Sequence, residues 1–330
     1  MPSPGAVMTT VVPAEGAILR QVVGTTPLAE LRGLSREAFA KYDTAQAKTA
    51  WALDHRRRFA LMQDGRVLAS AERYGLSGKL DRQIVTICGI AAVVSSGADD
   101  AGRSFGDALV EQLVEGAARD GADLALLFRT ADPQSPPPDG FETVPTGDVE
   151  LTVTESSRRG APMTLVRGGA DRDLDAIAAM GHARADRFRF HLDRSVDLIK
   201  HAITRKRLLA GLGAAGVRQM EFVIAEEGIT AAAYLVITVV GGTWTIEECG
   251  DRDASGARVG ALLQALIARE PVESRPVIRG WLPPGFLPPQ VAIASSPAAP
   301  PLLFARALSP RVEGLHLTAA EVMYWRSDVF

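Results

Sequence analysis

The chain has 330 residues, of which 47% are hydrophobic and 23% are charged, and its formal net charge is −3. The length predicts two domains, and the apolar content excludes a largely disordered chain because it is sufficient for a core. The near-neutral charge argues against an obligate nucleic-acid-binding protein, which would carry a basic surplus.

Residues 1–16 are rich in small residues and prolines and lack the basic and apolar regions of a signal peptide, so we expect a flexible leader. An apolar run of about 18 residues, as a membrane span requires, is absent from the sequence. Cys88 and Cys249 are far apart, which argues against a disulfide framework and for a reducing cytoplasm. Neither cysteine has a metal-ligand neighbour at useful spacing, so we expect no metal site.

The first half of the chain, residues 17–158, predicts a sheet and one long helix. Asp64-Gly65 joins two strand-like runs and is a strong hairpin signal. Apolar residues at helical spacing predict a helix over Ser104–Asp120, and a shorter helical pattern spans Leu28–Phe39. The expected strands are Ala17–Val23, Arg58–Gln63, Arg66–Tyr74, Gln83–Ser95 and Ala122–Phe128, followed by a further strand or hairpin over Phe141–Val153.

A polar, glycine-containing break at Ser156–Gly160 marks the expected domain boundary, so that the second domain covers residues 159–330. In this half, Gly241-Gly242 is a second hairpin signal. The expected helices are Asp171–Arg189, Asp193–Leu209 and Gly256–Arg269. The expected strands are Met163–Val166, Glu221–Ala225, Ala231–Val240, Thr243–Cys249, Val277–Leu282 and Leu302–Ala307, with Val322–Trp325 closing the second sheet.

The two halves share one order of elements: strand, helices, three antiparallel strands, glycine loop, helix and strand. Each also carries a Gly-x-x-x-Gly pattern before its helix, at Gly102–Gly106 and at Gly256–Gly260. In both halves the preceding strand contains a Cys-Gly pair, Cys88-Gly89 and Cys249-Gly250. The recurrence predicts a duplicated fold.

A glycine-bearing loop that leads into a helix presents free backbone N–H groups and the positive end of the helix dipole, so it favours phosphate groups. This loop is neither a Walker loop nor a Rossmann fingerprint, because no Gly-Lys-Ser/Thr follows and the preceding strands are antiparallel.

The order of elements resembles the GNAT superfamily of acetyl-CoA-dependent N-acetyltransferases, and the two-domain arrangement resembles its tandem type. The residues that carry the resemblance are Gly89–Ser96, the loop through Gly106, and Ala122–Phe128. The resemblance implies an α/β (α+β) fold of two GNAT-like domains, each a mixed, mostly antiparallel sheet flanked by helices.

The resemblance also implies a cofactor site in the first half. Val93, Val94 and Ser95 would meet the pantetheine arm of acetyl-CoA. The pyrophosphate loop would comprise Gly102, Arg103, Ser104, Phe105 and Gly106. The family's loop reads Arg/Gln-x-x-Gly-x-Gly/Ala, whereas this chain has Ala101 and Ser104 at the first two fixed positions. The second half has a shorter connection, and we expect it to be a degenerate copy.

Acetyl transfer to an amine needs a base for the ammonium proton and an acid for the leaving thiolate. Glu72 lies in a central strand, and Tyr74, two residues later, points to the same face. A solvated strand face is the alternative for Glu72. Glu247 and Glu248 are adjacent and would point to opposite faces, so one of them, for which Glu248 is the candidate, would be buried and in need of a partner.

The resemblance implies an N-acetyltransferase that transfers acetyl directly from acetyl-CoA to a small-molecule amine of unknown identity, using a general base. The alternative is a catalytically inactive GNAT-like protein that binds a small molecule or a partner. A cytoplasmic protein is expected, with no nucleic-acid or membrane partner, and a homodimer is possible.

Overall fold

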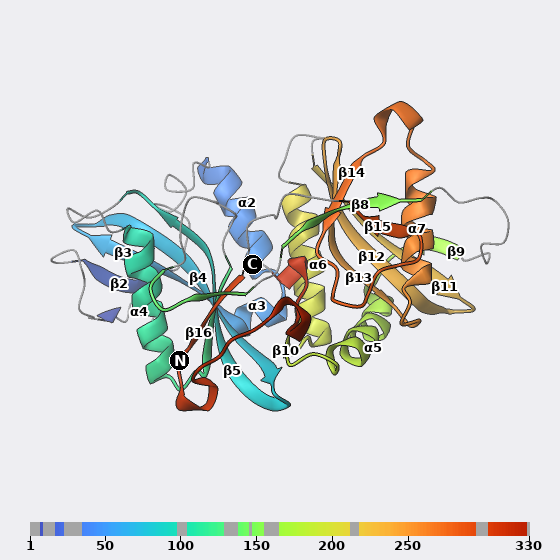
Figure 1. Cartoon of the computed structure of the whole chain (residues 1–330). Helices are drawn as coiled ribbons and strands as arrows, with labels where there is room; N and C mark the ends of the chain where they lie inside the picture. Colours follow the sequence, from blue (N-terminus) through green and yellow to red (C-terminus); the bar gives the residue numbers. More distant parts are fainter. Residues whose placement is uncertain are drawn as a thin grey trace. The chain divides into compact units, whose positions relative to one another are not determined.

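The computed structural model divides the chain into two compact units, each with its own sheet and helices (Figure 1). The first unit comprises Met1–Pro145, Pro301–Leu317 and Val329–Phe330, and the second comprises Thr146–Pro300 and Thr318–Asp328. The structure describes residues 7–8, 17–22, 35–97, 104–128, 138–144, 147–154, 165–211, 218–294 and 303–328. Most of the expected leader lies outside these residues.

The sheet of the first unit has the strand order β1-β2-β3-β4-β5-β6-β16-β7. Neighbouring strands are antiparallel except β5 and β6, which are parallel. The strands are β1 (Val7–Met8), β2 (Ile18–Gln21), β3 (Arg56–Gln63), β4 (Arg66–Leu80), β5 (Gln83–Ser95), β6 (Leu124–Phe128), β7 (Glu142–Val144) and β16 (Leu303–Ala307). Because a parallel pair needs a crossover connection, β5 and β6 are joined by helix α4 (Phe105–Arg119).

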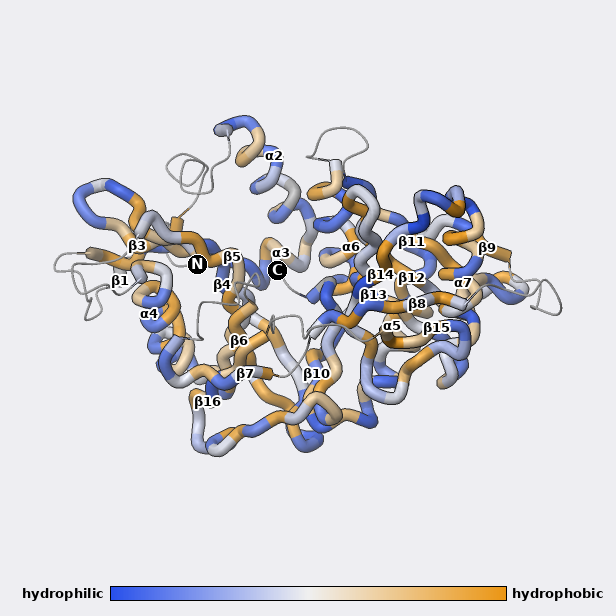
Figure 2. Tube along the Cα trace, turned by 45° about the horizontal axis from the view of Figure 1, so that its top comes forward, coloured by the Kyte–Doolittle hydropathy of each residue, from blue (hydrophilic) through white to orange (hydrophobic). Residues whose placement is uncertain are grey.

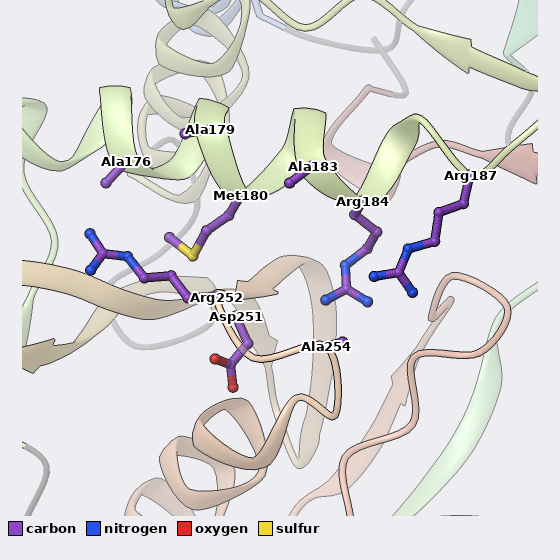
Figure 3. A pocket seen from close by; sticks show the side chains of 9 residues that line it. All are labelled: Ala176, Ala179, Met180, Ala183, Arg184, Arg187, Asp251, Arg252 and Ala254. Carbon is purple, nitrogen blue, oxygen red and sulfur yellow. The ribbon is translucent and has the colours of Figure 1, made fainter.

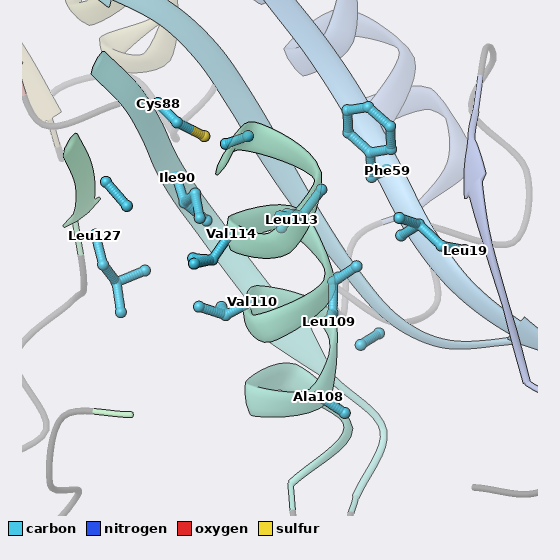
Figure 4. Packing of buried hydrophobic residues seen from close by; sticks show 14 of the residues in the cluster. Leu19, Phe59, Cys88, Ile90, Ala108, Leu109, Val110, Leu113, Val114 and Leu127 are labelled. Atoms are coloured by element: carbon cyan, nitrogen blue, oxygen red, sulfur yellow. The ribbon is translucent and has the colours of Figure 1, made fainter. Parts of the chain in front are cut away.

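Helix α4 supplies much of the first core (Figure 4). Leu109, Leu113 and Val114 are buried at its interface with β4 and β5. The helix begins at Ser104, whose hydroxyl accepts a hydrogen bond from the backbone N–H of Gly106 at 3.1 Å. Just beyond its end, Gly121 has a φ of +85°, which releases the chain toward β6. The predicted helix is confirmed.

Two further helices, α2 (Arg36–Ala47) and α3 (Ala50–His55), precede β3. Ser35 and Thr49 act as their N-caps, since each side-chain oxygen accepts a backbone N–H from the first turn. The helical pattern expected over Leu28–Phe39 lies largely outside the described residues, and its described part belongs to α2.

Two tight turns shape the antiparallel part of this sheet. Asp64 and Gly65 have φ values of 48° and 77°, which is the geometry of the expected two-residue hairpin. Asp81 and Arg82 also have positive φ values, 50° and 66°, so β4 and β5 continue as a ribbon as far as that turn. The sequence prediction ended the first of these strands at Tyr74, whereas β4 extends to Leu80.

The sheet of the second unit has the order β15-β8-β14-β13-β12-β11-β9, and its one parallel pair is β13 with β14. The strands are β8 (Val149–Val153), β9 (Leu165–Gly168), β11 (Arg218–Glu227), β12 (Thr230–Val240), β13 (Thr243–Asp251), β14 (Val277–Gly280) and β15 (Val291–Ile293). The helices are α5 (Leu174–Ala185), α6 (Val196–Ala210) and α7 (Ala257–Ile267). Every residue of β12 from Ala231 to Thr238 is buried, so both faces of this mostly apolar strand are covered (Figure 2).

Short elements complete the two units. Strands β10 (Phe190–Leu192) and β17 (Val322–Met323) pair with each other in parallel. The prediction that Val322–Trp325 closes the second sheet was wrong, because β17 pairs with β10 and not with the seven-stranded sheet. The 3-10 helices are η1 (Asp171–Asp173), η2 (Val272–Ser274), η3 (Pro310–Val312), η4 (Ala319–Glu321) and η5 (Arg326–Asp328).

Two strands lie in the sheet that is built mainly from the opposite half of the sequence. β8 lies in the second sheet between β14 and β15, and β16 lies in the first sheet between β6 and β7. The single strand or hairpin expected over Phe141–Val153 is therefore two separate strands, because β7 pairs with β16 and β8 with β14. The first unit ends at Pro145 and the second begins at Thr146, whereas the expected boundary was at Arg158. Two later segments, Pro301–Leu317 and Val329–Phe330, belong to the first unit again.

Both units nevertheless repeat one arrangement of elements. The series β3-β4-β5-α4-β6 and β11-β12-β13-α7-β14 have the same order and the same strand pairing. Cys88 and Cys249 lie on the corresponding strands β5 and β13, as expected. Their positions differ, because Cys88 pairs with β6 whereas Cys249 lies beyond Ile246, the last residue of β13 that pairs with β14.

Gly250 allows the buried ring of Tyr234 to lie across β13. A Cβ atom at Gly250 would be 2.4 Å from Cε1 of Tyr234, whereas a Cβ atom at Gly168, also in a strand, would meet open space. We expect Gly250→Ala to lower the free energy of unfolding by about 1–3 kcal/mol, since the tyrosine must move. Gly168→Ala, as the matched control, should leave it unchanged within about 0.5 kcal/mol. Equal effects in urea denaturation would contradict this packing.

Candidate functional site

Strand β5 is irregular in its second half. Its register with β4 shifts between the pairs Glu72–Ala91 and Ser70–Val94, so two residues of β5 lie opposite one residue of β4. Ala92, within this bulge, has a φ of +53°, a left-handed conformation that is strained for a residue other than glycine. Bulges and strained residues of this kind occur frequently next to functional sites.

The same strand separates from its parallel neighbour. β5 pairs with β6 only from Ile87 to Ile90, and it continues for five more residues, Ala91–Ser95. Among the described residues, this continuation has no partner on the side of β6. Val93 and Val94 are half-buried and Ser95 is exposed. The three residues expected to meet pantetheine therefore lie on a strand edge that no described strand pairs with on this side, as the addition of an extended ligand requires.

The beginning of helix α4 lies against this open edge. A Cβ atom at Gly106 would be 3.3 Å from Cγ1 of Val93 and 3.6 Å from Cβ of Ser95, so glycine permits the close approach. The backbone N–H of Phe105 donates to the carbonyl of Gly97 at 3.2 Å. The structure thus brings together the expected Val93–Ser95 and Ser104–Gly106. Gly102 and Arg103 of the expected loop lie outside the described residues.

Glu72 and Tyr74 form a buried ion-pair cluster with two arginines of β3. The Arg56 guanidinium donates from Nε and Nη2 to the two oxygens of Glu72, both at 2.8 Å. Arg58 adds a contact at 3.3 Å, and the hydroxyl of Tyr74 donates to Oε2 of Glu72 at 2.6 Å. The solvated strand face weighed for Glu72 is wrong, because its side chain is fully buried.

These contacts determine the acidity of Glu72. Burial by itself would raise the pKa of this carboxyl, but the hydrogen bonds and charge of Arg56, with Arg58 and Tyr74, hold it well below its ordinary value of 4.5. A carboxylate held in this way is a weak proton acceptor. The geometry around Glu72 is that of a structural ion pair, and its role as a general base stays a prediction that the contacts do not favour.

The two adjacent glutamates of β13, Glu247 and Glu248, are both buried. The register shift between Val236–Glu248 and Ile237–Ile246 makes Glu247 the extra residue of a bulge. A bulge interrupts the alternation of side chains along a strand, so the expectation that only one of the two glutamates is buried was wrong. Each has a separate partner: Lys206 donates to Glu247 at 2.7 Å, and Arg194 donates to both oxygens of Glu248 at 2.8 Å.

The cluster around Glu248 also involves the end of the chain. Arg194 donates from Nε to Oδ1 of Asp328 at 2.8 Å, and the hydroxyl of Tyr234 donates to Glu248 at 2.7 Å. Burial and the charge of Glu248 raise the pKa of Asp328 above its ordinary value, although Arg194 opposes this. One guanidinium thus serves two buried carboxylates, and Glu248, like Glu72, is held by hydrogen bonds from an arginine and a tyrosine.

The loop before α7 differs from the loop before α4 in a way that matters for anions. The Asp251 carboxylate accepts hydrogen bonds from the backbone N–H groups of Asp253 and Arg258, both at 2.8 Å, and from the Arg258 side chain at 3.0 Å. A carboxylate of the chain itself therefore occupies the N-terminus of α7. Gln290 also covers Gly260, because a Cβ atom there would be 1.9 Å from Oε1 of Gln290. This local geometry agrees with the expected degeneration of the second half.

Sequence reasoning missed the basic partners of these glutamates, Arg56, Arg58, Arg194 and Lys206, and it missed Asp328, which shares Arg194 with Glu248. A signal for the first two was present, since Arg56 and Arg58 alternate along a strand-like run and share one face. Arg194 and Asp328 lie far from Glu248 in sequence and carry no local signal.

The described residues offer little support for a metal site or a reactive thiol. No group of three or more His, Cys, Asp or Glu residues in that part of the chain could hold a metal ion. Cys88 and Cys249 are buried free thiols, and burial raises the pKa of Cys88 to about 11. Within the same residues, none of the helices combines the length and the apolar character needed to cross a membrane.

The fold has clear relatives among solved structures. A GCN5-related N-acetyltransferase from Kribbella flavida aligns over 88% of this chain and 72% of its own, at a TM-score of 0.61 and 17% identity. One from Anabaena variabilis aligns over 88% and 73%, at 0.60 and 11%. An N-myristoyltransferase from Saccharomyces cerevisiae with bound myristoyl-CoA aligns over 91% and 81%, at 0.55 and 8%.

Comparisons of the sequence itself are negative, since no family model and no curated protein matches it. The structural likeness shows that the chain has a GNAT-type fold, in the form of two mixed α/β units.

Replacing Glu72 tests the structural role of its cluster. Glu72→Gln removes the fully buried counter-charge of Arg56 and Arg58 and leaves them only the half-buried carboxylate of Asp43, so we expect the free energy of unfolding at neutral pH to fall by roughly 2–4 kcal/mol. Because the folded-state pKa of Glu72 lies below 4.5, its stabilisation is complete above that pH and is lost as the pH falls below it. The deficit of the variant should therefore shrink in acid.

Urea denaturation at a series of pH values measures this difference. Glu115→Gln, at an exposed position of α4, is the matched control and should behave like the unaltered protein. An unchanged stability at neutral pH, or a deficit that is constant down to acid pH, would contradict the assignment.

Proposed function

We propose that the protein is an acyl-CoA-dependent N-acyltransferase and that its first unit binds the acyl-CoA. The observation that carries the proposal is the open, bulged edge of β5 with the N-terminus of α4 against it. Support also comes from the fold, which it shares with proteins named as N-acetyltransferases and with an N-myristoyltransferase that holds myristoyl-CoA.

In this proposal the backbone of Val93–Ser95 pairs with the amides of the pantetheine arm in the manner of an added strand. The helix dipole at the start of α4 favours the pyrophosphate, which would replace the Gly97 carbonyl and the Ser104 hydroxyl as acceptors for the N–H groups of Phe105 and Gly106. Gly106 is essential because a larger residue would fill the space between the helix and β5. The transfer joins the amine nitrogen to the acyl carbon and breaks the carbon–sulfur bond, while the amine loses one proton and the thiolate gains one.

We further propose acetyl-CoA as the acyl donor and a small-molecule amine as the acceptor. Two of the structural neighbours are named as acetyltransferases, which supports the donor. The first unit is the better candidate because the N-terminus of α7 in the second unit already holds the Asp251 carboxylate.

One observation favours a second candidate function, a protein that binds a ligand or partner without catalysis. Glu72 and Tyr74, the candidate base and acid of the first unit, are hydrogen-bonded to each other, and Glu72 is also held by Arg56. Turnover would then need a proton acceptor other than Glu72. Saturable binding of acetyl-CoA with no thiol release across a broad panel of amines would favour this alternative.

Isothermal titration calorimetry with acetyl-CoA tests the proposal. We expect saturable binding to the unaltered protein and at least about a tenfold loss, about 1.4 kcal/mol, in Gly106→Trp, because the indole blocks the approach of the ligand to β5. Ala118→Trp places the same side chain at an exposed position of α4 and should bind normally.

Myristoyl-CoA, titrated in parallel, separates the donors. If only myristoyl-CoA binds, the proposal of an acyl-CoA site stands, and the proposal that acetyl-CoA is the donor is overturned. Absence of binding for both donors, or equal binding by Gly106→Trp, would overturn the site.

A further inference from the structure

A pocket of about 240 Å³ lies in the second unit between α5 and the loop that follows β13 (Figure 3). One wall is made by the small and apolar side chains of Ala176, Ala179, Met180 and Ala183 on α5. The polar lining consists of Arg184 in the last turn of α5, Arg187 just after this helix, Asp251 at the end of β13 and Arg252 in the loop that follows. The pocket therefore combines an apolar wall with three arginines.

Arg184 is the unusual member of this lining. Its side chain is only 6% exposed, and its guanidinium lies 3.6 Å from the ring centroid of Phe286. Among the described residues, no hydrogen bond or ion pair reaches this guanidinium. Stacking on an aromatic ring fixes the plane of the group and leaves its edge N–H donors for a ligand. A buried cation without a counter-ion is costly, and a bound anion would remove that cost.

The neighbouring charges reinforce this need for an anion. Arg187 is exposed, its guanidinium ends beside that of Arg184, and it too has no acidic partner among the described residues (Figure 3). Burial and then the charge of Arg187 lower the pKa of Arg184, although Asp251 opposes this. The Arg252 guanidinium donates to the hydroxyl of Thr230 at 3.1 Å and has no acidic partner in the described part of the chain.

The one acid of the lining does not neutralise these arginines. Asp251 accepts its hydrogen bonds from Asp253 and Arg258, so its two oxygens are already engaged. The pocket keeps a surplus of positive charge next to the N-terminus of α7, which Asp251 occupies. An anion would therefore bind at the α5 wall and not at the helix terminus.

We propose that this pocket binds a small phosphate monoester, whose phosphate meets Arg184 and Arg187 and whose body lies along the alanines and Met180. Two arginine forks side by side suit a doubly charged group with several acceptor oxygens. The site is independent of the acyl-CoA site proposed for the first unit. Its phosphate could belong to a free metabolite or to the coenzyme itself.

Titration with ribose 5-phosphate tests the site, with the N–H signals of the arginine side chains followed by NMR. We expect saturable binding that weakens with salt, a shift of the Arg184 signal, and at least about a tenfold loss of affinity, about 1.4 kcal/mol, in Arg184→Gln. Arg187→Gln, at an exposed position, should show a similar loss without a change in folding. Arg269→Gln, which removes an exposed charge elsewhere in this unit, should bind normally.

Three results would contradict the site, its specificity or its assignment to a free metabolite. Absence of binding, or equal affinity in Arg187→Gln and Arg269→Gln, would overturn the site even if Arg184→Gln fails to fold. Tighter binding of malonate than of ribose 5-phosphate would overturn the choice of phosphate. Coenzyme A distinguishes the sources: heat that persists in Gly106→Trp and disappears in Arg187→Gln would support the pocket and identify the coenzyme as its ligand.

Discussion

The brief pairing of β5 with β6 determines how the first unit is organised. Parallel strands must be joined by a crossover, and here the crossover is α4, which begins close to the point where the strands have separated. One topological requirement thus produces two features at one place: a strand edge without a neighbour among the described residues, and the positive end of a helix. Gly106 allows the two to approach closely, and the bulge at Ala92 turns the edge away from the regular sheet.

The second unit also has one parallel pair joined by a crossover helix, β13 and β14 with α7, but its own residues pack beside the point where the two strands separate. β13 leaves β14 after Ile246, and Trp281, the first residue after β14, contacts the rings of Tyr324 and Trp325. Helix η5, which follows Trp325 in the chain, packs against β13 and α6. Buried charges need partners, and the carboxylates of this region have them in Arg194 and Lys206. Topology alone therefore does not make a binding site in this fold, because side chains decide whether the opening stays free.

Local signals in the sequence predicted the local structure well. The hairpin at Asp64-Gly65, the helix ending near Gly121 and the two corresponding cysteine-bearing strands are all present. The positions of β8 and β16 could not be predicted, because strand pairing between distant segments leaves no periodic trace in either segment. The same holds for the candidate site: Val93–Ser95 could be proposed from the resemblance to a family, whereas the pairing of Arg194 with Glu248 depends on a fold that brings distant residues together.

The position of β16 has a consequence for how the chain acquires its structure. β16 lies between β6 and β7, so two strands from the first half of the sequence meet only through a strand made near its end. During synthesis the apolar edge of β6, Leu124–Phe128, stays without its antiparallel neighbour until residues 303–307 have emerged. The first sheet is then a late product of translation, and an edge of this kind is a site for wrong pairing between chains in the meantime.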